Sequence, residues 1–349
     1  MLMEGIFAAV PTPFYRDERI YFRKLEANQA RLSRSQLSGM VILGSTGEAP
    51  MLTDKESAEV LRVAAQGTAP EKVLIAGVGR ESVRATLELA EVAAQSQYDA
   101  VLVRPPSYYA SLCSPSAMLH YFGSIADRSP LPVVLYYAPH CIPVEMPVDI
   151  VAELAHHPNI IGIKDSSGQI ERIRALIEAT RVIPPHTVAV TPTFTAVTRR
   201  MLTPKPATDS NFVAARALTG DTAFAASAPA PKRRTKEVGF QVLCGTASTF
   251  LEALSVGASG GVLAFASFAP EASQEIYLAW KDHNQKLAEE NQRRVTVANR
   301  RIVGELGIGA VKYACDLNGY YGGYPRSPLL APTTEQQKEI ETLLAEIHN

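Results

Sequence analysis

Eight short apolar segments recur along the chain, and each is separated from the next by a longer stretch with a helical pattern. The segments are rich in Val, Ile, Leu and Ala, and none reaches the length of about 18 apolar residues that indicates a membrane span. Short runs of this kind are typical of strands that are buried on both faces of a parallel sheet. The segments are residues 5–10, 40–44, 73–78, 100–105, 132–139, 160–165, 240–245 and 260–265.

The stretches between the apolar segments carry helix signals. Residues 53–66 begin with Thr53, a residue type favoured at helix starts, and Glu56 follows at the capping-box spacing. Eight strands that are each followed by a helix predict an α/β protein, a (β/α)₈ TIM barrel. A doubly wound sheet is disfavoured because the first turn, "VPTPF", contains two prolines and lacks the glycine-rich phosphate turn.

Two parts of the chain do not fit a minimal barrel. The barrel itself accounts for residues 1–289, and residues 290–349 predict a C-terminal helical appendage. Residues 184–236 are rich in Ala, Thr, Pro and Ser, lack periodicity, and carry eight Lys or Arg against two Asp. This composition predicts a disordered insertion beside the seventh strand, with a basic docking arm as the alternative.

Composition excludes several classes of partner and cofactor. The 34 basic and 35 acidic residues give a net charge of −1, so no charge excess favours nucleic acid or a membrane surface. The four cysteines, Cys113, Cys141, Cys244 and Cys315, lie far apart and predict neither a metal site nor a disulfide framework. No signal-peptide pattern is present, and we expect a cytoplasmic protein without a cofactor.

The ends of the predicted strands carry hydroxyl groups, small residues and one lysine, Lys164. Function in a barrel is located at these carboxyl ends, and here they offer neither a carboxylate cluster nor paired histidines. A two-metal or two-carboxylate mechanism is therefore disfavoured. A lysine amine can instead attack a ketone and form an iminium ion, provided that burial lowers its pKa from about 10.4.

Two neighbouring features suit such chemistry. The phenol of Tyr136, at the end of the adjacent strand, could relay protons during imine formation and carbon–carbon cleavage. The "GSTG" turn, with Ser45 and Thr46, offers backbone N–H groups and hydroxyls to a small carboxylate. The residues therefore predict an enzyme that acts on a small oxoacid.

Four motifs, "GSTGE", "LYYAP", "GIKDSSG" and "VGASGGVLA", resemble the superfamily of dihydrodipicolinate synthase and N-acetylneuraminate lyase, which are class I pyruvate aldolases. The resemblance extends over nearly the whole chain apart from residues 184–236. Within the superfamily, "PVDIVAELAHHPNIIGIKDSSG" and "NGYYGGYPRSPL" are most similar to the 4-hydroxy-2-oxoglutarate aldolases.

The resemblance implies roles for individual residues. Lys164 would form the Schiff base, Tyr136 would shuttle protons, and Ser45 and Thr46 would bind the pyruvyl carboxylate. The remaining substrate-binding positions are Ser166, Gly245, Leu263 and Tyr109. Gly245 and Leu263 would present backbone groups to pyruvate, and Tyr109, preferred to Tyr108, would reach into a neighbouring subunit's site. Family members are commonly tetramers, so we expect a homo-oligomer.

One position departs from the pattern of the dihydrodipicolinate synthases. They carry an arginine five residues after the strand-five tyrosine, and this chain has Cys141 there. Condensation with aspartate semialdehyde thereby loses its main anchor. We expect a lyase that cleaves a 4-hydroxy-2-oxoacid, foremost 4-hydroxy-2-oxoglutarate, to pyruvate and glyoxylate. The alternatives are a 4-hydroxy-tetrahydrodipicolinate synthase and, in another class, a catalytically silent barrel that binds an oxoacid.

Overall fold

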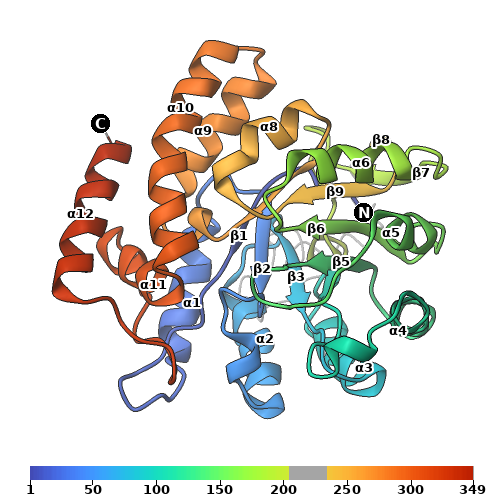
Figure 1. Ribbon diagram of the computed structural model, residues 1–349, viewed down its shortest axis with the longest axis horizontal. Helices are drawn as coiled ribbons and strands as arrows, with labels where there is room; N and C mark the ends of the chain where they lie inside the picture. The colour runs from blue at the N-terminus through green and yellow to red at the C-terminus, as the bar shows by residue number, and fades with distance from the viewer. Residues whose placement is uncertain (204–233, 349) are drawn as a thin grey trace, which may run out of the picture.

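A computed structural model describes residues 1–203 and 234–348 of the chain. Eight parallel strands close into a barrel in the order β1-β10-β9-β6-β5-β4-β3-β2, and the helices that connect them lie on the outside (Figure 1). The predicted (β/α)₈ TIM barrel is therefore confirmed. Its strands are β1 (Gly5–Ala9), β2 (Gly39–Ile42), β3 (Val73–Gly77), β4 (Ala100–Val103), β5 (Val133–Tyr137), β6 (Ile160–Asp165), β9 (Gln241–Cys244) and β10 (Gly260–Leu263).

A helix follows each strand of the barrel. The eight helices are α1 (Phe22–Leu32), α2 (Asp54–Gly67), α3 (Val83–Gln95), α4 (Pro115–Arg128), α5 (Val148–Leu154), α6 (Ile170–Thr180), α8 (Phe250–Ser255) and α9 (Pro270–Lys281). Helix α2 begins with the predicted capping box, in which the Thr53 hydroxyl accepts from the Glu56 amide and the Glu56 carboxylate accepts from the Thr53 amide. The strands are buried on both faces, apart from the half-buried Tyr137 at the end of β5, because helices cover the outside and side chains fill the barrel.

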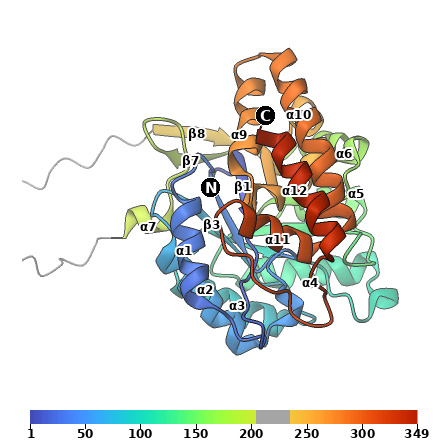
Figure 2. The ribbon, with the colours of Figure 1, turned by 90° about the vertical axis from the view of Figure 1, so that its left-hand side faces the viewer.

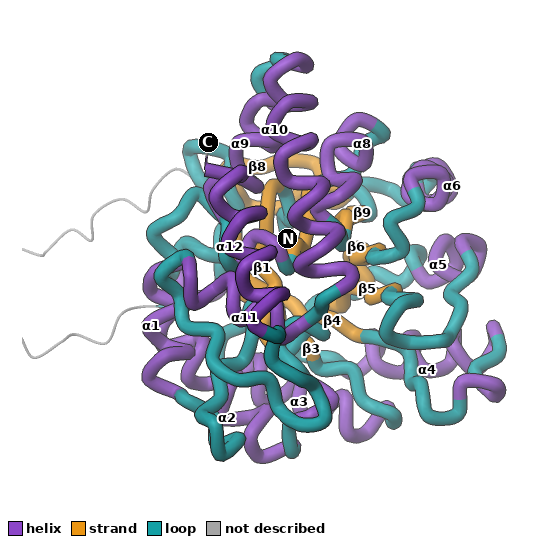
Figure 3. Tube along the Cα trace, turned by 60° about the vertical axis from the view of Figure 1, so that its left-hand side comes forward, coloured by secondary structure: helices purple, strands orange, loops and turns teal. Residues whose placement is uncertain are grey.

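Further helices follow the barrel at the C-terminus. They are α10 (Gln285–Ala298), α11 (Ile308–Leu317) and α12 (Thr334–His348), and a π-helical segment at Asn299–Glu305 connects the first two. These helices gather at one side of the barrel, on the left in Figure 1 and at the front in Figure 3. Helix α10 starts at Gln285, so the predicted boundary between residues 289 and 290 falls inside this helix.

Both ends of the segment 184–236 are built into the fold, which differs from the predicted disorder. Strands β7 (His186–Val190) and β8 (Arg234–Val238) pair antiparallel, and the short helix α7 (Arg199–Leu202) follows β7. Val188, Val190 and Val238 pack with Leu2 in a small buried cluster, which explains the order. The part of the prediction that falls on residues 204–233 lies outside the described residues.

The two-stranded β7–β8 sheet lies at one end of the barrel (Figure 2). The Thr198 hydroxyl donates to the Pro70 carbonyl at 2.5 Å, and the Arg199 amide donates to Asp99 at 2.6 Å. Pro70 and Asp99 precede β3 and β4, so these contacts are made at the amino ends of the strands. The β7–β8 sheet therefore does not border the predicted site, although β7 follows β6 and α6 in the sequence.

Within the described ranges 1–203 and 234–348, no helix combines the length and the apolar composition that crossing a membrane requires.

Candidate active site

Lys164 and Tyr136 lie side by side at the carboxyl ends of β6 and β5. The two residues are register partners in the parallel pair, so their side chains leave the sheet on the same face. Both are buried, with 4% and 6% of their surface exposed. The Lys164 Nζ lies 4.3 Å from the centroid of the Tyr136 ring, a distance at which an ammonium group is attracted to the ring face.

The turn after β2 reaches the same point. The hydroxyls of Ser45 and Tyr136 lie 3.0 Å apart and form a hydrogen bond. The turn is closed by the Gly47 amide, which donates to the Gly44 carbonyl, and Thr46 is buried within it. Ser45, Tyr136 and Lys164 therefore form one connected row. The roles that the resemblance implies for them stay predictions.

A cavity of about 470 Å³ opens beside this row. Ser45 and Tyr136 line it together with Cys141 and Ile142 from the loop after β5, whereas Lys164, Thr46, Ser166 and Gly245 are not among its lining residues. A volume of this size accommodates a small organic acid. The complete lining consists of Leu43, Gly44, Ser45, Ala49, Pro50, Leu52, Asp54, Gly77, Gly79, Arg80, Glu81, Leu102, Arg104, Ser107, Tyr136, Cys141 and Ile142.

Ser166 and Gly245 meet at the ends of β6 and β9. The Ser166 amide donates to the Tyr137 carbonyl at 2.9 Å, which fixes the chain directly after Lys164. A Cβ atom on Gly245 would come within 2.0 Å of the Ser166 Oγ, so the position next to Ser166 accepts only glycine without a shift. The Gly245 amide already donates to the Asp165 carbonyl at 2.7 Å.

The structure places Leu263 and Tyr109 away from the cavity. Leu263 ends β10, is fully buried, and pairs in register with Ala8. Tyr109 is 68% exposed on the loop after β4, and its ring meets the exposed ring of Tyr108 edge-on at 5.0 Å. Its contact with a neighbouring subunit stays a prediction.

A buried ion pair holds the end of β6 next to Lys164. The Asp165 carboxylate is fully buried and pairs with Arg172 of α6 at 2.7 Å, and the Arg172 guanidinium lies 4.1 Å from the Tyr137 ring centroid. Asp165 also accepts hydrogen bonds from the amide and hydroxyl of Ser167. The sequence analysis did not single out Arg172, although this residue lies in the helix that follows Lys164 in the sequence.

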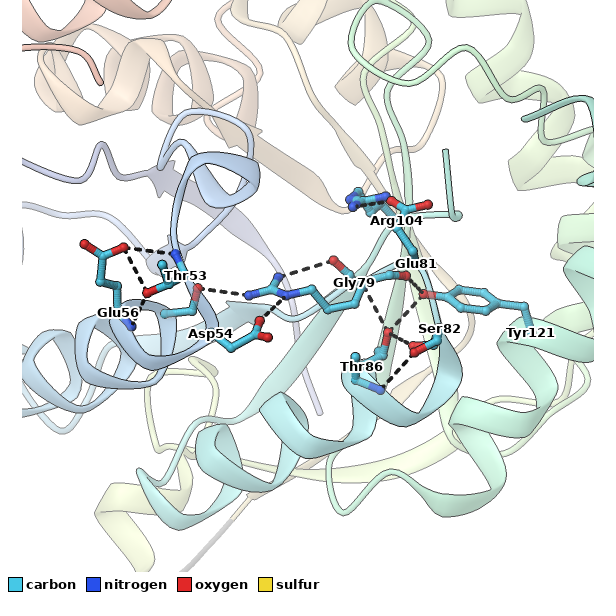
Figure 4. Close-up of polar contacts among 12 residues, drawn as sticks. Thr53, Asp54, Glu56, Gly79, Glu81, Ser82, Thr86, Arg104 and Tyr121 are labelled. Atoms are coloured by element: carbon cyan, nitrogen blue, oxygen red, sulfur yellow. Dashed lines mark hydrogen bonds and ion pairs between the residues drawn. The ribbon is translucent and has the colours of Figure 1, made fainter. Parts of the chain in front are cut away.

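The cavity lining also includes four charged residues that the sequence analysis did not single out, Asp54, Arg80, Glu81 and Arg104. Glu81 accepts from Arg104 at 2.8 Å and from the backbone amides of Ser107 and Tyr108, and Figure 4 shows the Glu81 and Arg104 side chains turned toward each other. Arg80 pairs with Asp54 at 3.2 Å. A sequence signal was available, because Arg104 lies at the end of the predicted strand 100–105 and Glu81 follows the predicted strand 73–78 by three residues.

The buried phenol of Tyr121 supports the backbone at Arg80, one of the charged lining residues. The Tyr121 hydroxyl donates to the Arg80 carbonyl at 2.7 Å and shares a hydrogen bond with the Thr86 hydroxyl (Figure 4). Burial raises the pKa of Tyr121 to about 12, so the phenol stays protonated and acts as a donor at neutral pH.

The cysteines near the site differ in their surroundings. Burial raises the pKa of the Cys244 thiol to about 11, which leaves it a neutral space-filling group. Cys141 is exposed at the cavity.

In the described part of the chain, no three His, Cys, Asp or Glu side chains gather closely enough to hold a metal ion.

Comparison with known proteins identifies similar chains. The family model described as "Dihydrodipicolinate synthetase family" matches residues 2–184 and 207–347. A Coccidioides immitis protein, named provisionally as a mitochondrial 4-hydroxy-2-oxoglutarate aldolase, is 27% identical over 92% of this chain and 88% of its own length. A 4-hydroxy-tetrahydrodipicolinate synthase of Methanothrix thermoacetophila is also 27% identical, over 99% of this chain and 97% of its own. The L-threo-3-deoxy-hexylosonate aldolase of Hypocrea jecorina is 28% identical over 93% and 90%.

Solved structures share the fold. The dihydrodipicolinate synthase of Bacillus anthracis aligns with a TM-score of 0.78 at 24% identity, covering 99% of both chains. The enzyme of Acinetobacter baumannii, solved in complex with pyruvate, aligns with a TM-score of 0.77 at 22% identity, covering 100% of this chain and 99% of its own. These likenesses support the barrel architecture.

Proposed function

The chain belongs to the dihydrodipicolinate synthetase family of class I aldolases and lyases, and from this membership we propose that it cleaves 4-hydroxy-2-oxoglutarate to pyruvate and glyoxylate. The observation that carries the proposal is the row of Ser45, Tyr136 and Lys164, in which the hydroxyls lie 3.0 Å apart and the amine lies against the phenol ring.

The proposed reaction begins with attack of the neutral Lys164 amine on the C2 ketone. Loss of water gives an iminium ion. In that loss of water Tyr136 gives its phenolic proton to the departing hydroxyl. The resulting phenolate then takes the proton of the C4 hydroxyl as the C3–C4 bond breaks, and the bonding electrons move into the iminium nitrogen. Glyoxylate leaves, the enamine is protonated at C3, and hydrolysis releases pyruvate and the free lysine. The hydroxyls of Ser45 and Thr46 hold the C1 carboxylate throughout.

Cys141 supports the choice of the aldolase over the synthase. It occupies the place where the synthases carry a carboxylate-binding arginine, and it borders the cavity. The synthase remains the second candidate, because one relative with that name is equally similar to this chain. A mixture of pyruvate and aspartate semialdehyde that yields a cyclised product would identify the synthase. Release of glyoxylate from 4-hydroxy-2-oxoglutarate would identify the aldolase.

Borohydride trapping tests the shared step of both candidates. The protein is incubated with pyruvate and borohydride, and the adduct is located by intact mass and peptide mapping. We expect one reduced pyruvyl group on Lys164, and none on Lys164→Met. A folded wild-type protein without an adduct would contradict the imine mechanism. Binding of pyruvate without turnover of either substrate would favour the silent barrel.

A further inference from the structure

The turn that would bind the substrate carboxylate is held in an unusual backbone conformation. Leu43 and Glu48, which flank Gly44–Gly47, both have positive φ angles, of 59° and 56°. Side chains with a Cβ atom rarely adopt this region, and they persist there only when surrounding contacts enforce it. The turn therefore depends on what holds its two ends.

The C-terminal helices hold the Glu48 end. The side chains of Glu48 and Lys312, from α11, form an ion pair, and both are fully buried. The Glu48 carboxylate also accepts from the Arg326 amide at 2.8 Å, and the Lys312 ammonium donates to the Tyr324 carbonyl at 2.7 Å. Lys312 further lies 4.3 Å from the ring centroid of Phe14.

Two hydrogen bonds connect Glu48 to Ser45 and Ser45 to Tyr136. The Glu48 amide donates to the Ser45 carbonyl at 3.0 Å, so the backbone of Glu48 and Ser45 is joined within the turn. The Ser45 hydroxyl in turn bonds to Tyr136. A displacement of Glu48 would therefore move the hydroxyl that contacts both the carboxylate and the proton shuttle.

Stability alone does not account for a fully buried ion pair. Burying two charges costs free energy that a pair of apolar side chains of similar volume avoids, and such replacements are often neutral or stabilising. Burial lowers the pKa of Lys312 to about 8, while Glu48 acts in the opposite direction. What the pair provides is a fixed position for the end of the turn.

We propose that Glu48 and Lys312 are positioning residues, through which the C-terminal helices fix the carboxylate-binding turn and thereby set the affinity for the pyruvyl group. The inference rests on the proposed function, because the affected ligand is the oxoacid of that site. Neither side chain lines the cavity, so both act through Ser45.

The test measures the pyruvate concentration that gives half-maximal borohydride trapping in three variants. Glu48→Gln and Lys312→Met each leave one buried group unpaired, and the double variant replaces the ion pair with a neutral pair. We expect both single variants to lower Tm and the double variant to recover part of it. The half-maximal concentration should rise about tenfold or more in all three, because none of them fixes the turn.

Ile340→Ala is the matched control for stability. Ile340 is fully buried in α12, which packs on α10 and α11, so its truncation lowers Tm while both partners of the Glu48–Lys312 ion pair are kept. We expect its half-maximal pyruvate concentration to stay within about twofold of wild type.

Two results would overturn the inference. One is an unchanged half-maximal concentration in Glu48→Gln. The other is a double variant in which pyruvate affinity recovers together with Tm, since this would make the ion pair a structural element only. A wild-type protein that pyruvate does not modify would instead overturn the proposed function and, with it, this inference.

Discussion

Replacement of Tyr136 by phenylalanine removes one oxygen atom from the row of Ser45, Tyr136 and Lys164 and leaves the ring in place. Among the described residues the hydroxyl hydrogen-bonds to Ser45 at 3.0 Å, and the ring lies 4.3 Å from the Lys164 Nζ. Because the ring remains, packing at this position and the contact with Lys164 are retained. The variant therefore isolates proton transfer from the shape of the site.

The expected effect of Tyr136→Phe on stability is much smaller than its expected effect on the reaction rate. Loss of one hydrogen bond beside a water-accessible cavity costs about 1 kcal/mol of unfolding free energy. Loss of a general acid–base group lowers the rate by about 10²- to 10⁴-fold, which corresponds to about 3–5 kcal/mol of transition-state stabilisation. If Tyr136 shuttles protons, kcat falls far more than stability does.

The assay compares kcat for oxoacid cleavage and Tm in Tyr136→Phe and Tyr137→Phe. Tyr137 is the next residue of β5, and its ring lies against Arg172 rather than Lys164, so the second variant is a matched loss of one phenol oxygen. We expect Tyr137→Phe to retain kcat within about threefold. A Tyr136→Phe variant that also stays within threefold of wild type, or equal losses in both variants, would refute the assignment.

Three further variants test the supporting structure. Gly245→Ala places a Cβ atom 2.0 Å from the Ser166 Oγ, and it should cost about 1–3 kcal/mol in denaturant unfolding and lower kcat, whereas no loss would show that the turn can shift freely. Arg326 holds the pKa of Glu56 at about 2, so this carboxylate contributes stability above pH 4.5 that is lost as the pH falls toward 2. Because Glu56 is partly exposed, Glu56→Gln should reduce the unfolding free energy at pH 7 by about 1–2 kcal/mol and at pH 2 by much less; equal losses at both pH values would contradict this. Thr53→Ala should cost about 1 kcal/mol at pH 7 with activity unchanged, and altered pyruvate trapping would argue against a purely capping role.

That Ser45, Tyr136 and Lys164 lie at the same end of the barrel could be predicted from local patterns in the sequence. The apolar run before Lys164 indicates a buried strand, and the rule that barrel sites lie at the carboxyl ends of strands selects the residues that follow such runs. Tyr136 and Ser45 were found in the same way. The capping box of α2 was equally predictable, because its hydrogen bonds join residues only three positions apart.

The two-stranded sheet of β7 and β8 was missed because the contacts that stabilise it join segments far apart in the chain. Its strands are separated by more than 40 residues, and its buried cluster includes Leu2 from the N-terminus of the chain. An alternating pattern as short as that of residues 186–190 is weak evidence for a strand without a partner to cover one face. Only the tertiary structure shows that this partner lies at the amino end of the barrel.

The sequence by itself determined the barrel and indicated Lys164 and the hydroxyls around it as a candidate site, because hydrophobic periodicity fixes the strands and chain direction fixes which of their ends carries function. The tertiary structure alone decided that Leu263 lies in the core, that Tyr109 lies outside the cavity, and that Lys312 pairs with Glu48. These outcomes depend on contacts between segments far apart in the chain. Such contacts arise when the barrel closes and the last helices pack against its side, and no local pattern of residues specifies them.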